Sequence, residues 1–135
     1  MTAISLSSPK TLPPPAGYSQ IAEVTRGKLV LIAGQVAHDA AGNLVGENDF
    51  AAQVEQIFRN LDAAVRAAGG AFRNVVKFNC YCVASVDPQQ LAAFRTVRDR
   101  YVDTSAPPVS TFVFVSRLVR PAWLFEMDAM AVIDA

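Results

Sequence analysis

Hydrophobic spacing along this chain switches from short strand-like runs to a helical repeat near residue 50. Residues 18–24 and 29–33 are short apolar-rich runs, and Arg26-Gly27-Lys28 lies between them. Two such runs separated by a glycine-containing turn predict a β-hairpin. The second run ends at Gly34, and Ala41-Gly42-Asn43 marks a further turn before a short strand near Leu44.

From residue 50 onward the apolar positions repeat with the period of a helix. They follow i, i+4, i+7, i+8 spacing and form one face, which consists of Phe50, Val54, Ile57, Phe58, Leu61, Ala64, Val65 and Ala68. Asn48 or Asp49 can cap the first turn. Gly69-Gly70 ends the helix, because glycine accepts the left-handed cap conformation at low cost. The pattern predicts an amphipathic helix over residues 50–68.

The second half of the chain repeats a strand and a helix and then adds two strands. Residues 75–83 are β-rich, and Asp87-Pro88 with Gln90 is typical of a helix start. The apolar stripe of this second helix consists of Leu91, Phe94, Val97 or Arg98, and Tyr101. The helix ends before Pro107-Pro108, and residues 109–116 and 123–133 follow as strands. The last run is apolar on both faces, which predicts a central strand covered on both sides.

The order β-β-α-β-α-β-β predicts an α/β (α+β) domain with one mixed sheet and two helices on one face. A chain of 135 residues fits a single domain. Residues 1–15 contain Pro13-Pro14-Pro15, so we expect an extended lead-in that joins no sheet. The domain is then expected to span residues 16–135.

Composition adds a reason for self-association. Hydrophobic residues make up 52% of the chain, and the mean hydropathy is +0.25. No run approaches the roughly 18 uncharged apolar residues of a membrane-spanning helix. The predicted sheet leaves one face uncovered, and its residues are not polar enough for water. We therefore expect oligomerisation and no membrane partner.

Charge and cysteine usage disfavour several function classes. The 12 basic and 12 acidic residues cancel without a long block of either sign, so no nucleic-acid partner is expected. Cys80 and Cys82 point to the same face of a predicted strand, which favours buried thiols. With His38 as the single histidine, a zinc site is not expected, nor is another metal or a cofactor. No signal peptide is visible, which leaves cytoplasmic residence as the default.

Several short segments, in order, are similar to those of one known family. They are Gly17-Tyr18-Ser19-Gln20, Ala33-Gly34-Gln35, Ala67-Ala68-Gly69, Val75-Val76-Lys77, Pro108 with residues 113–118, and residues 125–132. Together they resemble the RidA/YjgF family, formerly called endoribonuclease L-PSP, over roughly residues 16–133. The resemblance implies a chorismate-mutase-like fold and a homotrimer with a cleft between each pair of subunits. Members of the family hydrolyse imines and enamines; endoribonuclease and chaperone-like activities are also attributed to it.

The resemblance also suggests which residues of this chain form the cleft. Asp128 takes the place of the family's glutamate on the last strand, where a carboxylate can align water as a general base. The alternative is that Asp128 pairs with a neighbouring donor. Tyr18 corresponds to the cleft tyrosine, and Ala33 and Gly34 correspond to the family's strand end beside the ligand.

Three positions depart from the family pattern. Ser110 replaces the arginine that grips the substrate carboxylate, Phe112 replaces a cysteine, and Arg95 replaces an asparagine. A serine loses the bidentate charged hydrogen bonds of a guanidinium, which weakens binding of a carboxylate by about ten- to several-hundred-fold. We therefore do not expect an efficient 2-imino acid deaminase. Arg95 supplies either a new anion contact or a solvated surface charge.

Two classes of function remain open at this point. The first is hydrolysis of an imine, an enamine or a related C=N substrate that lacks a free α-carboxylate, with a water aligned by Asp128. The second is a non-catalytic ligand-binding or chaperone-like trimer.

Overall fold

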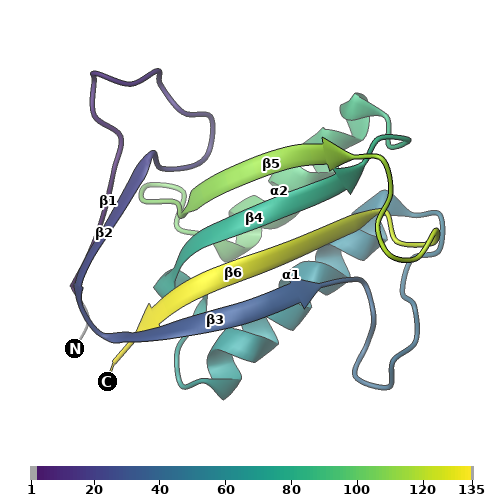
Figure 1. The fold of residues 1–135 in the computed structure, drawn as a ribbon, viewed down its shortest axis with the longest axis horizontal. Helices are drawn as coiled ribbons and strands as arrows, with labels where there is room; N and C mark the ends of the chain where they lie inside the picture. Colours follow the sequence, from purple (N-terminus) through teal and green to yellow (C-terminus); the bar gives the residue numbers. More distant parts are fainter. Residues whose placement is uncertain (1–2, 135) are drawn as a thin grey trace.

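The computed structural model describes residues 3–134, and Figure 1 shows their arrangement. The six strands are β1 (Ala3–Ser7), β2 (Ile21–Arg26), β3 (Lys28–Gln35), β4 (Val75–Val83), β5 (Val109–Val115) and β6 (Phe125–Ile133). The helices are α1 (Phe50–Ala67) and α2 (Leu91–Tyr101), with short 3-10 turns at Phe72–Asn74 and Pro88–Gln90.

The main sheet has four strands in the order β3-β6-β4-β5. β6 runs antiparallel to both of its neighbours, whereas β4 and β5 are parallel and are connected through α2. Both helices lie behind the same face of this sheet (Figure 1). The predicted mixed sheet with two helices on one face is confirmed, and β6 is the predicted central strand.

Alternation along the strands decides which side chains enter the core. In β6, Phe125, Met127 and Ala129 are buried, whereas Glu126 and Asp128 between them are only partly buried. Because successive strand residues point to opposite faces, the first set lies under the helices and the second on the open face. On the helix side, Phe58 of α1 contacts the rings of Phe72, Phe78, Phe94 and Tyr101.

The ends of the first helix follow the predicted signals. Asp49 is the N-cap, and its Oδ1 accepts a hydrogen bond of 3.1 Å from the backbone N–H of Ala52. The last helical residue is Ala67, and Gly69 adopts a φ of 99°, which is the left-handed region that glycine tolerates. Asp87 caps the 3-10 turn Pro88–Gln90 and not α2 as predicted: its carboxylate accepts from the backbone N–H of Gln89 at 2.9 Å, and α2 begins after this turn, at Leu91.

The N-terminal segment differs from the expectation that it joins no sheet, and that expectation is wrong. Ala3–Ser7 pairs antiparallel with β2 in a separate two-stranded sheet. The first proline is Pro9, so the missing N–H groups of the prolines lie beyond the end of this strand. Near Leu44, where a short strand was predicted, there is one isolated bridge, to His38.

The predicted hairpin between β2 and β3 is also wrong. β2 pairs with β1, and β3 pairs with β6. Gly27, with a φ of 128°, is the single residue between the two strands. The commonest short hairpin loop has two residues, so one residue redirects the chain into a second sheet rather than back onto the first strand.

The face of the main sheet opposite the helices is open in the single chain. Leu29 and Leu31 of β3 and Met130 of β6 are exposed there, and Leu31 is 68% accessible. The register pairs Leu31 with Met130, so these side chains adjoin on this face. On this face of β6, Val132 is buried within the chain whereas Met130 is accessible, so an apolar surface remains for another molecule to cover.

Candidate functional site

A cavity of about 400 Å³ opens between α2 and the beginning of β5. Four of the sequence-predicted residues line it together: Tyr18, Arg95, Ser110 and Phe112. The remaining lining residues are Ala16, Leu91, Phe94 and Arg98. Its mixture of aromatic walls and a few convergent polar groups is typical of a small-molecule site.

Tyr18 reaches this cavity because its segment is fastened to the start of β5. The Ser19 hydroxyl donates to the carbonyl oxygen of Pro107 at 2.6 Å, and the Ser19 backbone N–H donates to that of Pro108 at 3.1 Å. Ser19 also forms an isolated parallel bridge with Val109. The proline-rich loop thus forms one wall of the cavity, and in Figure 1 it lies beside the beginning of β5.

Ser110 borders the cavity next to a buried thiol. Burial raises the pKa of Cys80 to about 12, and a hydrogen bond from Ser110 and the charge of Arg98 oppose that rise. Burial likewise raises the pKa of Cys82 to about 11. Both cysteines are free and buried, as predicted. They remain protonated near neutral pH, so neither is an active nucleophile.

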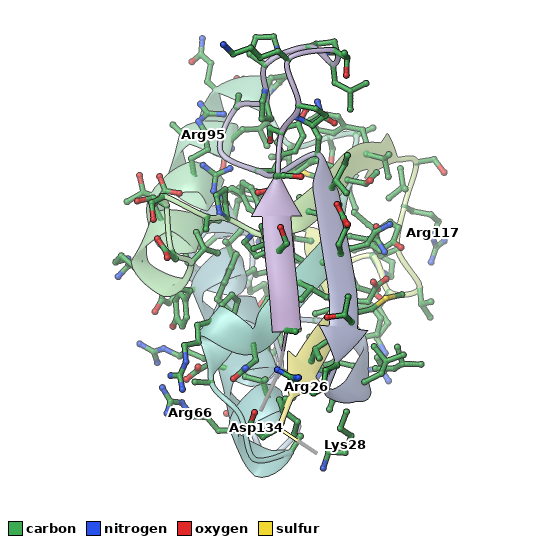
Figure 2. The ribbon with its side chains drawn as sticks, turned by 90° about the vertical axis from the view of Figure 1, so that its left-hand side faces the viewer. Arg26, Lys28, Arg66, Arg95, Arg117 and Asp134 are labelled. Atoms are coloured by element: carbon green, nitrogen blue, oxygen red, sulfur yellow. The ribbon has the colours of Figure 1, made fainter. Side chains whose placement is uncertain are left out.

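Arg98 is a cavity residue that the sequence did not identify as functional. It is 9% exposed, and its Nε donates to the carboxylate of Asp99 at 2.9 Å. Its guanidinium carbon lies 5.7 Å from the centre of the Phe94 ring. Its position in the apolar stripe of α2 could have identified it, because a charged side chain is rarely buried unless it has a partner. Arg95, one turn earlier, also lines the cavity, and Figure 2 labels it beside the N-terminal loop.

Asp128 lies elsewhere, on the open face of the sheet. Its Oδ1 accepts a hydrogen bond from the Asn79 side-chain amide and its Oδ2 accepts one from the Tyr81 hydroxyl, both at 2.9 Å. The hydrogen bond to Asp128 raises the pKa of Tyr81. Each carboxylate oxygen therefore already has a neutral donor, which fits the alternative that Asp128 pairs with its neighbours.

Glu126 is a second carboxylate on the same face, and the sequence analysis missed it. Burial, and then the negative charge of Asp128, raise the pKa of Glu126. Its carboxylate lies against Gly34, where any added side chain would collide with it. Ala33 and Gly34 lie where the pairing of β3 with β6 shifts register, between Ile32 and Gln35. Carboxylates with raised pKa values cluster at functional sites.

The structure therefore divides the predicted site between two faces of one sheet. Ser110 and Phe112 pair with Phe78 and Cys80, whose side chains are buried on the helix side. Asp128 pairs with Asn79, whose side chain bonds to it on the open face. Within one chain, the cavity residues are brought together, whereas Asp128, Ala33 and Gly34 do not line that cavity.

Comparison with known proteins places this arrangement in a family. The family model described as endoribonuclease L-PSP matches residues 9–133. The chain belongs to the RidA/YjgF family. A crystal structure of the Rid-family protein YyfB from Yersinia pestis, of unknown function, superposes with a TM-score of 0.87 at 34% identity over 96% of this chain and 98% of the other. RidA from an Antarctic Psychrobacter superposes with a TM-score of 0.68 at 30% identity, over 88% of this chain and 93% of the other.

Curated relatives show the same membership in sequence. Protein DfrA of Myxococcus xanthus is 35% identical over 125 residues, which are 93% of this chain and 89% of DfrA. A RutC family protein of Synechocystis is 32% identical, with 90% of each chain covered. This RidA/YjgF member contains, within residues 3–134, no cluster of three side chains suited to hold a metal ion. No helix in that part of the chain is long and apolar enough to cross a membrane.

Replacing Glu126 of this RidA/YjgF protein with glutamine is expected to raise its melting temperature at about pH 8 but not at about pH 4. Its pKa in the folded state lies above the ordinary value of 4.5, so ionisation costs stability as the pH rises through the folded-state pKa. Glutamine removes that cost, and below the ordinary value both states are protonated and the gain disappears. Calorimetry at the two pH values measures the difference.

The matched control is Glu47→Gln, because Glu47 lies exposed in the loop before α1. It is expected to leave the melting temperature nearly unchanged at both values. A stabilisation by Glu126→Gln that is equal at both pH values would contradict the electrostatic explanation.

Proposed function

We propose that this RidA/YjgF protein assembles as a homotrimer whose intersubunit clefts bind a small metabolite and hydrolyse its C=N bond. The observation that carries the proposal is the cavity in which Tyr18, Arg95, Ser110 and Phe112 meet. The substrate is an imine, an enamine that tautomerises to one, or a related compound.

The division of the site between two faces of the sheet supports a cleft shared by subunits. The carboxylates of Glu126 and Asp128 lie on the open face, and the cavity lies on the helix side. The open face is also the surface that leaves Leu29 and Leu31 accessible. Covering it with another copy removes apolar surface from water and brings the carboxylates of one subunit to the cavity edge of its neighbour.

The chemistry requires a group that takes a proton from water and returns one to nitrogen. Water adds to the imine carbon and forms a carbinolamine, which then expels the protonated nitrogen as an amine or ammonia and leaves a carbonyl. Glu126 suits this role because its raised pKa places proton uptake nearer to neutral pH. Asp128, the residue that the sequence suggested, is the other candidate, and its negative charge helps to raise that pKa. Tyr18 supplies a hydroxyl to the ligand.

A second candidate function is ligand binding without turnover. Both oxygens of Asp128 are engaged by Asn79 and Tyr81, and the Ser110 hydroxyl is engaged with Cys80. A cavity with these groups occupied still binds a ligand through its aromatic walls and its arginines, without aligning water.

Freshly generated 2-aminoacrylate and 2-iminobutanoate test the first function through the rate at which the keto acid forms. We expect a modest acceleration over spontaneous hydrolysis, because Ser110 supplies no bidentate clamp. Glu126→Gln is expected to abolish it. If Asp128→Asn abolishes it and Glu126→Gln does not, Asp128 is the water-aligning group. No acceleration, combined with stabilisation by a bound metabolite, would favour the binding function.

A further inference from the structure

Two arginines line a second cavity, at the end of the main sheet where β4 and β5 finish. This cavity measures about 200 Å³, and its lining consists of Arg117, Arg120, Val83, Ser85, Ser116, Leu118, Pro121 and Trp123. No carboxylate belongs to the lining. Within residues 3–134, the ion pairs of arginine involve Arg59, Arg66, Arg98 and Arg100, and neither arginine of this cavity. The cavity therefore contains two positive charges that no lining side chain balances.

The guanidinium of Arg117 is held in one orientation by its own loop. Its Nε donates to the carbonyl oxygen of Leu118, and one of its Nη atoms donates to that of Val119, both at 3.0 Å. These acceptors carry no net charge, so they fix the guanidinium without cancelling its charge. A guanidinium has five N–H groups, and these two bonds leave three of them for an anion. Figure 2 shows Arg95 and Arg117 on opposite sides of the molecule, so this cavity is separate from the one between α2 and β5.

Arg120 is positioned by Trp123, the single tryptophan of the chain. Its guanidinium carbon lies 5.4 Å from the centre of the Trp123 ring, which is a cation–π contact. The indole N–H donates to Nε2 of His38 at 2.9 Å, so the ring is itself fixed from the loop before α1. An aromatic ring attracts a cation but has no net charge. Arg120 is therefore held in place with its full charge available to a ligand.

Two hydroxyl groups complete the polar part of the cavity. Ser85 lies in the turn after β4, and Ser116 directly follows β5; both are exposed. Guanidinium groups with hydroxyl donors beside them suit the terminal oxygens of a phosphoryl group. A phosphate monoester carries a charge of about −1.5 to −2 at pH 7 and three strong acceptor oxygens. A carboxylate carries one charge on two oxygens, so the two arginines match the phosphoryl group better.

We propose that the cavity at the end of β4 and β5 binds the phosphoryl group of a small phosphate monoester, held by Arg117 and Arg120 with the hydroxyls of Ser85 and Ser116. Its volume of about 200 Å³ lies below the roughly 300–1,000 Å³ of pockets for drug-sized ligands. That size favours a small ligand over a whole nucleotide cofactor. The site goes beyond the proposed hydrolysis of a C=N bond, and it does not depend on that reaction or on its residues.

Calorimetric titration of the whole chain with three probes tests this site. The probes are glycerol 3-phosphate, inorganic phosphate and acetate, at about pH 7.5, where a phosphate monoester is mostly doubly charged, and at fixed ionic strength because salt screens charge. We expect glycerol 3-phosphate to bind about tenfold or more tightly than acetate, since it accepts more charged hydrogen bonds. It should also change the fluorescence of Trp123, because the ligand contacts the arginine that lies over this ring.

Arg117→Met and Arg120→Met are each expected to weaken the binding of glycerol 3-phosphate by about tenfold. Arg117→Lys is expected to restore part of the affinity, because lysine keeps the charge but lacks the planar fork. The matched control is Arg59→Met, which removes the same charge from an exposed site on α1, where Arg59 pairs with Glu55 outside the cavity. This control should leave the affinity unchanged.

Three outcomes would overturn the site. Acetate that binds the unmodified protein as tightly as glycerol 3-phosphate would show that no phosphoryl group is recognised, and this comparison requires no variant to fold. Inorganic phosphate that binds more tightly than the monoester would exclude the monoester as the ligand. An affinity that survives both Arg117→Met and Arg120→Met would place binding elsewhere. Failure of imine hydrolysis would leave this site intact, because the two cavities share no residue.

Discussion

Gln53→Leu is expected to destabilise the fold by about 2–4 kcal/mol, because three partly buried hydrogen bonds to backbone groups are lost. Gln53 is fully buried in α1. Its amide nitrogen donates to the carbonyl oxygens of Gly46 and Ala122, each at 3.0 Å. Its side-chain oxygen accepts from the backbone N–H of Leu124 at 2.9 Å. Leucine fills the same space but bonds to none of them.

Equilibrium unfolding in urea measures this loss, with Gln56→Leu as the control. Gln56 lies in the same helix, and its recorded hydrogen bond is to the side chain of Asn60, at 2.9 Å. The control is expected to lose about 1 kcal/mol or less, because the freed Asn60 oxygen is the one group left without this donor. Equal losses in the two variants would mean that the stability of the fold does not depend on the bonds from Gln53 to the loop before β6.

The elements that the sequence predicted well are those with local signals. The helix from Phe50 needed only its 3.6-residue repeat, the Asp49 cap and Gly69, all within one stretch of chain. The strand from Val75 to Val83 was predicted with its observed bounds, because a continuous apolar run between turn signals determines it. A mixed sheet with two helices on one face followed from the order of these elements, although β2 was expected in it and lies in the two-stranded sheet instead.

The errors concern which strand pairs with which, since that depends on the whole sheet rather than on neighbouring residues. Adjacent strands usually pair, which made a hairpin of β2 and β3 the natural expectation. A single residue, Gly27, is too short a loop for that pairing, and β6, far along the chain, pairs with β3 instead. The pairing of β1 could not be predicted from the proline content of residues 1–15, because prolines prevent pairing only at their own positions, and Ala3–Ser7 contains none.

In the candidate site, the sequence indicated that a carboxylate on the last strand takes part, but not which of the two carboxylates there has which role. Glu126 and Asp128 are two apart on one strand, so they share a face and periodicity cannot tell them apart. What separates them is long-range: Asn79 and Tyr81 bond to Asp128, whereas Glu126 lies against Gly34. The sequence placed Arg98 in the apolar stripe of the second helix. Its guanidinium lies against Gly17, a residue far away in the sequence, so its position in the fold could not be predicted from local spacing.

Leu31→Asp is expected to convert the proposed homotrimer into monomers at micromolar concentration. Leu31 lies on the open face of β3, opposite Met130 in the register, and is 68% exposed in the single chain. Burying one leucine at a contact contributes about 1.5–3 kcal/mol. An aspartate there must also lose hydration without a partner. A symmetric trimer contains the substitution three times, so the penalty is repeated at each of its three interfaces. We expect the sum to exceed the free energy of association.

Light scattering coupled to size exclusion measures the mass of each variant, with Val119→Asp as the matched control. Val119 lies in the loop after β5, away from the sheet, and is 78% exposed, so the same substitution there adds a charge without touching the open face. The control is expected to keep the mass of the unmodified protein. Since the carboxylates and the cavity meet only between subunits in this proposal, Leu31→Asp should also lose any imine hydrolysis. A monomeric unmodified protein, or a Leu31→Asp variant that still assembles, would remove the basis for a shared cleft.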